Sequence, residues 1–250
     1  KLNIEEIKPS SRRYPAIIFE QEREAGNQIL EVSSLSFSNE NETFFKDINF
    51  NLKKGDKVLI LSKNSRACNY FYECLSGNLK STSGSYSWGI TTSFGYLPLD
   101  NSSFFNNKLS LVDWLRQWTN TDEEKEELYI RGFLGKMLFS GDEALKSCDV
   151  LSGGEKVRCM LSKIMMGNPN VLLIDEPTNH LDLESITTFN NSLINFKGTV
   201  LMSTNDIAFA KSVSNRIIEI TPNGIIDSYL SFDEYVKDKK IINQRERLYK

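Results

Sequence analysis

The sequence lacks the features that mark membrane-spanning, disulfide-rich or strongly basic proteins. Its four cysteines have no C-x-x-C spacing and no metal-binding pattern. No apolar run approaches the roughly 18–20 residues that a membrane-spanning helix needs. The formal net charge is only −3, so overall charge does not indicate a nucleic-acid partner. These absences predict a reduced, cytoplasmic protein with no membrane segment.

What the sequence contains is the composition and the periodicity of an α/β protein. Its 250 residues, 40% hydrophobic and 25% charged, suffice for one large domain or two modest ones. β-rich runs over residues 28–52 predict antiparallel strands, and residues 101–165 have helical apolar spacing without a β-rich run. From residue 171 onward, apolar strands alternate with helices. This alternation predicts a mostly parallel sheet covered on both faces.

An acidic pair follows one of the apolar strands. The run VLLIDEPTNHLD, residues 171–182, places Asp175 and Glu176 where a buried parallel strand ends, and ligands bind there in open α/β sheets. An aspartate in this position can hold Mg²⁺ through water, and the glutamate beside it can polarise the water that attacks a γ-phosphate. The alternative interpretation, without any catalytic role, is a strand end followed by a proline turn. The full run through PTNHLD argues against it.

A second motif lies upstream of the acidic pair. The run LSGGE, residues 151–155, fits a capping box that opens a helix, with Ser152 as the N-cap and Glu155 as its partner. Together with Gly153 and Gly154, this helix N-terminus offers exposed N–H groups and a positive dipole end to an anion. A well-capped helix without a ligand is the alternative interpretation.

The two motifs together resemble those of ATP-binding-cassette (ABC) ATPases. LSGGEKVRCMLSK is similar to their signature motif, and VLLIDEPTNHLD is similar to their Walker B strand and D-loop. The TNHLD ending and the opening IKPSSRRYPAIIFE resemble the ABC-F family of tandem-domain ATPases, in particular its YbiT-type branch and its C-terminal nucleotide-binding domain. The resemblance covers essentially the whole chain. It implies a P-loop-type parallel sheet flanked by helices, an antiparallel β subdomain and a helical signature subdomain.

The resemblance also implies a division of the chain. Residues 1–26 correspond to the end of a linker between two domains, and residues 27–235 to the nucleotide-binding domain, with its helical subdomain at about 101–165. Residues 236–250 form a tail with six Lys or Arg against two Asp or Glu. We expect a solvated terminal helix in this tail, and a contact with RNA phosphates is the alternative.

The loop that should bind the phosphates departs from the family pattern. The family reads G-x-N-G-x-G-K-[ST]-[ST], whereas this chain, anchored on Asn64, reads SKNSRACNY over residues 62–70. A non-glycine residue in the left-handed region costs roughly 1–2 kcal/mol, so the phosphate nest is harder to form. Cys68 replaces the phosphate-binding lysine and Asn69 replaces the Mg²⁺-binding hydroxyl, while Lys63 and Arg66 are charged but out of register. The degenerate positions are Ser62, Asn64, Ser65, Ala67, Cys68 and Asn69.

Two other elements of the same ATP site also depart from the family. In GYLPLD, Leu99 stands where the family has a glutamine that senses Mg²⁺ and the attacking water. The switch histidine corresponds to Asn205, because the single histidine of the chain, His180, belongs to the D-loop with Asp182. Phe37 is the candidate for the aromatic side chain that stacks on adenine.

The phosphate loop, the glutamine and the switch histidine all depart from the family pattern, whereas the signature motif is kept. The way in which ABC domains pair explains this combination. In ABC dimers, each ATP lies between the P-loop of one domain and the signature of the other. The resemblance therefore implies that the LSGGE residues, Ser152 to Glu155, complete a site on the N-terminal domain of the same protein. The chain's own site, with Asp175 and Glu176 as the catalytic pair and Asp175 as the Mg²⁺ ligand, is then silent.

The implied function is that of an ATP-gated translation factor that binds the ribosome, with ATP and Mg²⁺ as cofactors of the full-length protein. Three alternatives stay open at this point. The chain could be a self-sufficient ATPase with an unusual loop, or a non-catalytic pseudo-ATPase that only binds a partner. It could also be a transporter component whose permease is a separate chain, although TNHLD argues against this.

Overall fold

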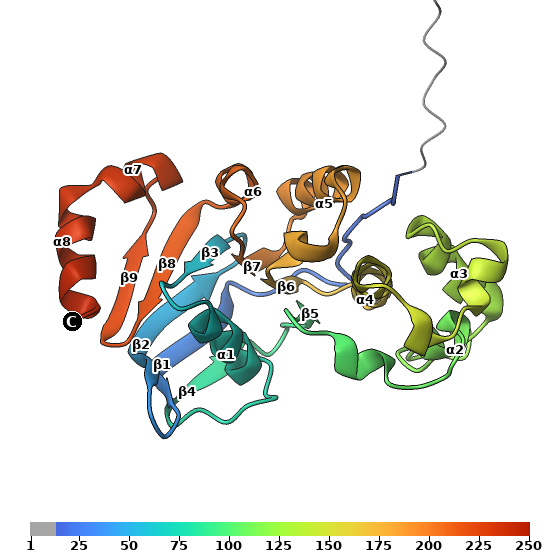
Figure 1. The fold of residues 1–250 in the computed structure, drawn as a ribbon, viewed down its shortest axis with the longest axis horizontal. Helices are drawn as coiled ribbons and strands as arrows, with labels where there is room; N and C mark the ends of the chain where they lie inside the picture. Colours follow the sequence, from blue (N-terminus) through green and yellow to red (C-terminus); the bar gives the residue numbers. More distant parts are fainter. Residues whose placement is uncertain (1–13) are drawn as a thin grey trace, which may run out of the picture.

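The computed structural model describes residues 14–250, and the first half of the expected linker lies outside the described residues. Its centre is a six-stranded sheet that is parallel except for its last strand (Figure 1). Each central strand is a short apolar run bounded by polar residues, which is the pattern of a strand buried on both faces. Across the sheet the strands are β5 (Phe94–Leu97), β6 (Val171–Asp175), β7 (Thr199–Ser203), β3 (Lys57–Leu61), β8 (Arg216–Thr221) and β9 (Gly224–Ser228).

A separate antiparallel sheet and one helix cover one face of the central sheet. In the antiparallel sheet, β1 (Gln28–Ser38) lies between β2 (Thr43–Lys53) and β4 (Ser83–Trp88). The helix α1 (Ser65–Leu75) lies between the two sheets and buries Phe71 against Phe45 and Phe50. The predicted antiparallel β subdomain is confirmed.

Two helices cover the opposite face, α5 (Leu183–Asn195) and α6 (Ile207–Val213), as Figure 1 shows. The extended segment that enters the domain packs beside α5. Its Phe19 is buried and meets Phe189 and Phe196 edge-on, with ring centroids 5.9 and 6.1 Å apart. The described part of the expected linker is therefore held against the domain.

The predicted helical subdomain is present between β5 and β6. It contains α2 (Leu111–Arg116), α3 (Glu127–Lys136) and α4 (Gly153–Met166), joined by the short 3₁₀ turns η1 (Ser102–Phe105), η2 (Gly141–Leu145) and η3 (Cys148–Val150). Residues 121–126, expected to be helical, form turns instead. Glu124 there accepts from the backbone of Asn120, and its own amide donates to Thr121. Such local side-chain bonds compete with helix formation.

The chain ends in two helices, α7 (Phe232–Lys237) and α8 (Lys239–Leu248), that flank β9, and the basic tail, residues 236–250, consists mainly of α8 (Figure 1). The expected terminal helix is α8, which is exposed along most of its length and buries Ile241 on one side. Tyr235 and Ile241 are buried, and Arg245 donates to both carboxylate oxygens of Glu219, at 2.8 and 3.0 Å. Within residues 14–250, every helix is too short or too polar to traverse a bilayer.

Candidate functional site

The loop between β3 and α1 uses its own backbone amides. The amide of Lys63 donates to Tyr249 Oη at 2.9 Å, and that of Asn64 donates to Ser62 Oγ at 3.3 Å. Asn64 is the N-cap of α1, and its side chain and carbonyl oxygen accept from Arg66 N at 3.1 Å and Ala67 N at 2.9 Å. A phosphate-binding loop needs such amides free, so this loop offers few of them to an anion.

The two cations of the loop also have partners inside the chain. Glu42, from the turn between β1 and β2, accepts from Arg66 Nη2 at 2.9 Å and from Asn64 Nδ2 at 2.7 Å. The ammonium of Lys63 lies 4.2 Å from the ring centroid of Tyr249. Neither cation lies among the residues around Asp175, so neither substitutes for the missing lysine.

The candidate adenine platform is covered by the chain itself. Phe37 meets the ring of Tyr70 at a centroid distance of 4.8 Å, and Tyr70 also contacts Phe44 at 4.6 Å. Tyr70 comes from α1, at a position where the family has a small hydroxyl residue. The ring of Tyr70 therefore lies in the space beside Phe37.

The carboxylate of Asp175 is satisfied by side-chain donors from two neighbouring elements. Ser203 Oγ donates to Oδ1 at 2.6 Å, and Asn69 Nδ2 donates to Oδ2 at 3.1 Å. Ser203 ends β7, in register with Asp175 at the end of β6. Burial raises the pKa of Asp175, although these two hydrogen bonds oppose the shift. Both oxygens are thus engaged where a metal-bound water would be held.

Glu176 points toward the same space but is also bonded within the chain. Its backbone is left-handed, with φ of 48°, and its Oε2 accepts from the backbone amide of Asn205 at 3.1 Å. Burial raises the pKa of this carboxyl, and the negative charge of Asp175 adds to the rise. The predicted switch position therefore reaches Glu176, but through its main chain.

The structure brings the sequence-predicted elements of one ATP site together around a small cavity. Its volume is about 60 Å³. Such a space holds a few waters, whereas ligand pockets typically measure ~300–1,000 Å³. Cys68, at the lysine position, is buried, and burial raises the pKa of its thiol so that it carries no charge. The lining includes Ser62, Ser65, Cys68, Leu99, Asp175, Glu176 and Asn205.

The LSGGE residues lie apart from this cavity, at the N-terminus of α4. Ser152 forms the predicted capping box with Glu155, whose Oε2 accepts from Ser152 N at 2.9 Å and from Ser152 Oγ at 2.7 Å. Burial of Glu155 opposes its ionisation, yet hydrogen bonds from Ser152 and Lys146 outweigh it and lower its pKa to about 2. Ser152 and Gly153 are exposed, so this end of the helix can be reached by another molecule.

The D-loop packs directly on the two glycines of this motif. A Cβ on Gly154 would lie 2.7 Å from the carbonyl oxygen of His180, and one on Gly153 would lie 3.2 Å from His180 Nδ1. Only glycine allows this approach. His180 ends the 3₁₀ turn η4 (Pro177–His180), and Asp182 then caps α5 by accepting from Ser185 N at 2.8 Å.

Three residues of this site were not predicted from the sequence: Ser203, Glu42 and Tyr249. Ser203 had a local signal, because a polar residue that ends a parallel strand next to β6 must lie beside Asp175. Glu42 and Tyr249 had none, since their contacts join the loop to distant parts of the chain. Each of the three is hydrogen-bonded to a group that could otherwise contact a phosphate or a metal-bound water.

A nucleotide and Mg²⁺ do not fit the space around Asp175. The amides of the loop, the carboxylate oxygens and the aromatic face of Phe37 already have partners, and the cavity is too small. The N-terminus of α4 can be reached by an anion, because Ser152 and Gly153 are exposed there, while the Ser152 hydroxyl is bonded to Glu155. The two motifs thus differ in their surroundings, since Asp175 is bonded within the chain whereas Ser152 and Gly153 are exposed.

Comparison with known proteins identifies the class. A family model described as "ABC transporter" matches residues 45–179, so the chain belongs to the ABC transporter family. The dimeric post-hydrolysis structure of the ATP-binding cassette MJ0796 with ADP and Pi has the same fold. It is 18% identical, with a TM-score of 0.63, and the match covers 81% of this chain and 99% of that one. The predicted fold class is confirmed.

The chain is an ABC ATPase domain related to ABC-F proteins. It is 47% identical to YkpA of Bacillus subtilis, named an uncharacterized ABC transporter ATP-binding protein, over 100% of this chain and 46% of YkpA. It is 39% identical to YbiT of Escherichia coli O157:H7, named a probable ATP-binding protein, over 96% of this chain and 45% of YbiT. The chain thus spans about half the length of these relatives.

Two more distant relatives carry names with further information. The chain is 29% identical to ABC transporter F family member 5 of Arabidopsis thaliana, over 96% of this chain and 35% of that protein. It is 29% identical to the energy-dependent translational throttle protein EttA of Escherichia coli K12, over 86% of this chain and 39% of EttA.

Proposed function

We propose that this chain is the C-terminal nucleotide-binding domain of a longer ABC-F protein and that its own ATP site is closed. Its catalytic contribution is the LSGGE motif, which completes an ATP site on the N-terminal domain of the same protein. The observation that carries this proposal is the contrast between the two sites. The amides of Lys63, Asn64, Arg66 and Ala67 are bonded internally, whereas Ser152 and Gly153 stand exposed on a preformed helix end.

The roles of the residues follow from this contrast. The hydroxyl of Ser152 and the amides of Gly153 and Gly154 would hold the terminal phosphate of a nucleotide bound by the partner domain. Glu155 positions Ser152 through the capping box and keeps its own charge neutralised by Lys146, 2.9 Å away. Mg²⁺ would belong to the partner's site, and Asp175 and Glu176 would serve the packing of the strand ends.

The length and the relatives support a tandem arrangement. The chain matches about half of YkpA and YbiT, which leaves room in each for a second domain of similar size. On this proposal residues 1–26 are the end of the linker, residues 27–235 the nucleotide-binding domain and residues 236–250 its tail. The packing of Phe19 on α5 agrees with a linker that is anchored on the domain it enters.

The proposed role of the full-length protein is an ATP-gated translation factor in the cytoplasm that binds the ribosome. The support is relatedness to EttA, which is named a translational throttle, and to an ABC-F protein. ATP would hold the two domains together, because each nucleotide would join a P-loop to a signature. Nucleotide binding by the partner domain would thereby control the shape presented to the ribosome.

Titration of Mg-ATP into the purified chain tests the closed site. We expect no heat of binding up to millimolar ATP, because the loop amides and both Asp175 oxygens are already engaged. Binding at micromolar ATP would contradict the proposal and favour a self-sufficient ATPase.

A pair of variants in the full-length protein tests the open half-site. Ser152→Ala should lower ATP turnover at the composite site, whereas Glu176→Gln in this domain should leave turnover unchanged. Loss of turnover in the Glu176→Gln variant would show that the chain's own site is active. No turnover in the parent protein, combined with ATP-independent sedimentation with ribosomes, would favour a pseudo-ATPase. Failure to sediment with ribosomes under any nucleotide condition would refute the translation role.

A further inference from the structure

A second, larger cavity lies between the helical subdomain and the edge strand β5. Its volume is about 380 Å³, within the range of small-molecule pockets. None of its lining residues belongs to the closed phosphate site. The signature motif does not line it either, because only the C-terminal part of α4 reaches it. Nothing in the proposed function uses this cavity.

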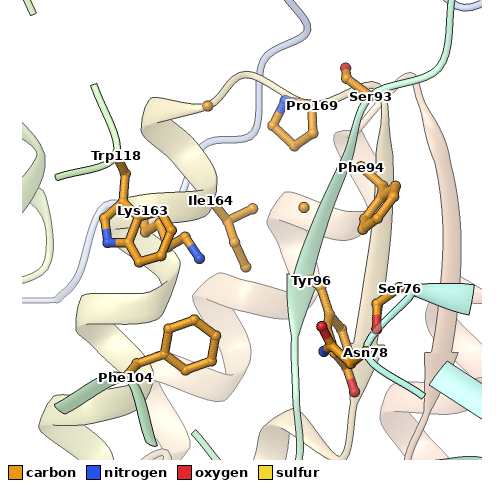
Figure 2. A pocket seen from close by; sticks show the side chains of 12 residues that line it. Ser76, Asn78, Ser93, Phe94, Tyr96, Phe104, Trp118, Lys163, Ile164 and Pro169 are labelled. Carbon is orange, nitrogen blue, oxygen red and sulfur yellow. The ribbon is translucent and has the colours of Figure 1, made fainter. Parts of the chain in front are cut away.

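The cavity contains one cation without an anionic partner. The ammonium group of Lys163, in the last turn of α4, forms no ion pair and no hydrogen bond with any residue from 14 to 250. Its Nζ lies 3.7 Å from the ring centroid of Trp118 and 4.6 Å from that of Phe104. Figure 2 shows its side chain directed into the cavity, with Phe104 and Trp118 on the same side. Burial lowers its pKa to about 8, so the amine is still mostly protonated at neutral pH.

The opposite wall is aromatic and rigid. Phe94 and Tyr96 of β5 line it (Figure 2), and both are fixed by contacts outside the cavity. Phe94 stacks on Trp88 at a centroid distance of 5.1 Å, and Tyr96 Oη donates to Glu73 Oε1 at 2.7 Å. Between them, Gly95 lets α4 approach the strand, because a Cβ there would lie 2.7 Å from Ile164 Cγ2. These walls need no rearrangement to receive a ligand.

We propose that this cavity binds a small ligand in which a flat apolar ring carries a carboxylate or phosphate group. The anion would pair with Lys163, and the ring would lie against the aromatic walls. Aromatic walls favour flat rings through offset stacking and edge contacts. A half-buried ammonium gains most from an anion, since it lacks both full hydration and a carboxylate of its own. This inference is independent of the state of the ATP site.

Titration of the chain with 2-naphthoate and with neutral 2-naphthamide, followed by NMR, tests the proposal. The two probes share the ring and differ in charge. We expect naphthoate to bind at least about tenfold more tightly than naphthamide, the gain of a charge-assisted pair over a neutral one. Lys163→Met should remove this difference and leave naphthamide binding unchanged.

Two further variants separate the ring from the charge. Trp118→Ala, at a side chain that is 39% exposed, should weaken both probes together. Lys136→Met is the matched control, because Lys136 also lies over a ring, 4.7 Å from the centroid of Phe133, but outside the cavity. It should change neither affinity. Equal affinity for the two probes, no binding at millimolar naphthoate, or binding that survives both Lys163→Met and Trp118→Ala would each overturn the proposal.

Discussion

The side-chain amide of Asn69 donates a hydrogen bond to Asp175 Oδ2 across 3.1 Å, between the second turn of α1 and the end of β6. Ser203 donates to the other oxygen of the same carboxylate, so the acidic strand end has two donors from its own chain. Asn69 therefore links the start of α1 to the acidic end of β6 through one side-chain hydrogen bond.

Replacing Asn69 by Asp should destabilise the fold strongly at neutral pH. The change removes a donor and places a second carboxylate against the buried Asp175, which should lower the free energy of unfolding by ~2 kcal/mol. Burial already raises the pKa of Asp175, and the new charge would raise it further. The loss in the free energy of unfolding should be complete at pH 7. It should shrink as the pH falls, because the two neighbouring carboxyl groups then take up a proton. Chemical denaturation at several pH values measures this.

The matched control for that change is Asn243→Asp, at an exposed position of α8. It introduces the same charge without a buried neighbour, so its effect on unfolding should be small and independent of pH. Equal deficits in the two variants would contradict the importance of the contact between Asn69 and Asp175.

Replacing Tyr249 by Phe should loosen the phosphate loop from the tail. The hydroxyl of Tyr249 accepts from the amide of Lys63, and its loss should cost ~1 kcal/mol of stability. Hydrogen exchange at the Lys63 amide should accelerate, because that amide loses its acceptor. Tyr14→Phe, at a side chain that is 52% exposed, serves as the control and should leave this amide unchanged. Unaltered exchange in Tyr249→Phe would refute the contact.

Replacing Arg245 by Met should release α8 from the domain. Glu219 is buried, and without Arg245 its charge has no cationic partner, which typically costs ~3–5 kcal/mol. Adding Glu219→Gln should recover much of the loss, because Gln can still accept from Tyr235 Oη, now 2.6 Å from Glu219 Oε2. Thermal unfolding of the single and double variants measures the coupling. Arg247→Met, on the exposed side of α8, should change little, and no rescue in the double variant would refute the prediction.

Replacing Glu155 by Gln should reveal a pH-dependent contribution at the signature helix. Gln keeps the capping box but loses the charge opposite Lys146, which should cost ~0.5–1 kcal/mol at pH 7. The pKa of Glu155 is lowered from 4.5 to about 2, so its ionised form stabilises the fold above pH 4.5. That stabilisation is lost as the pH falls from 4.5 toward 2, and the difference between parent and variant should vanish over this range.

Glu234→Gln is the control for this pH profile. Glu234 occupies the same position in the capping box of Ser231 but has no ion pair with a lysine among the described residues. Its replacement should produce a weaker pH dependence. If both variants followed the same profile, the contribution would come from the capping box and not from Lys146.

The strands were predictable because their signals are local. The apolar run from Val171 to Ile174, bounded by polar residues, suffices to predict a buried strand with Asp175 at its end. The missing glycines of residues 62–67 suffice to predict a poor phosphate nest. The partner of the Lys63 amide was not predictable, since Tyr249 lies 186 residues from Lys63 in the sequence.

The aromatic cavity was not predictable for a related reason. The periodicity of α4 shows that Ile164 faces inward, but it does not show which segment covers Lys163. Trp118 does so from the region after α2, where turns bring it over the helix. Such contacts depend on loop paths, and loop paths have no periodicity to detect.

The contact between His180 and Gly154 has a mechanical consequence. The carbonyl oxygen of His180 lies so close to Gly154 that a Cβ at this position would come within 2.7 Å of it. His180 belongs to the short turn that follows Asp175 and Glu176. This turn therefore connects the N-terminus of α4 to the end of β6. A displacement of the exposed N-terminus of α4, at Ser152, would therefore be transmitted to the backbone beside Asp175 and Glu176.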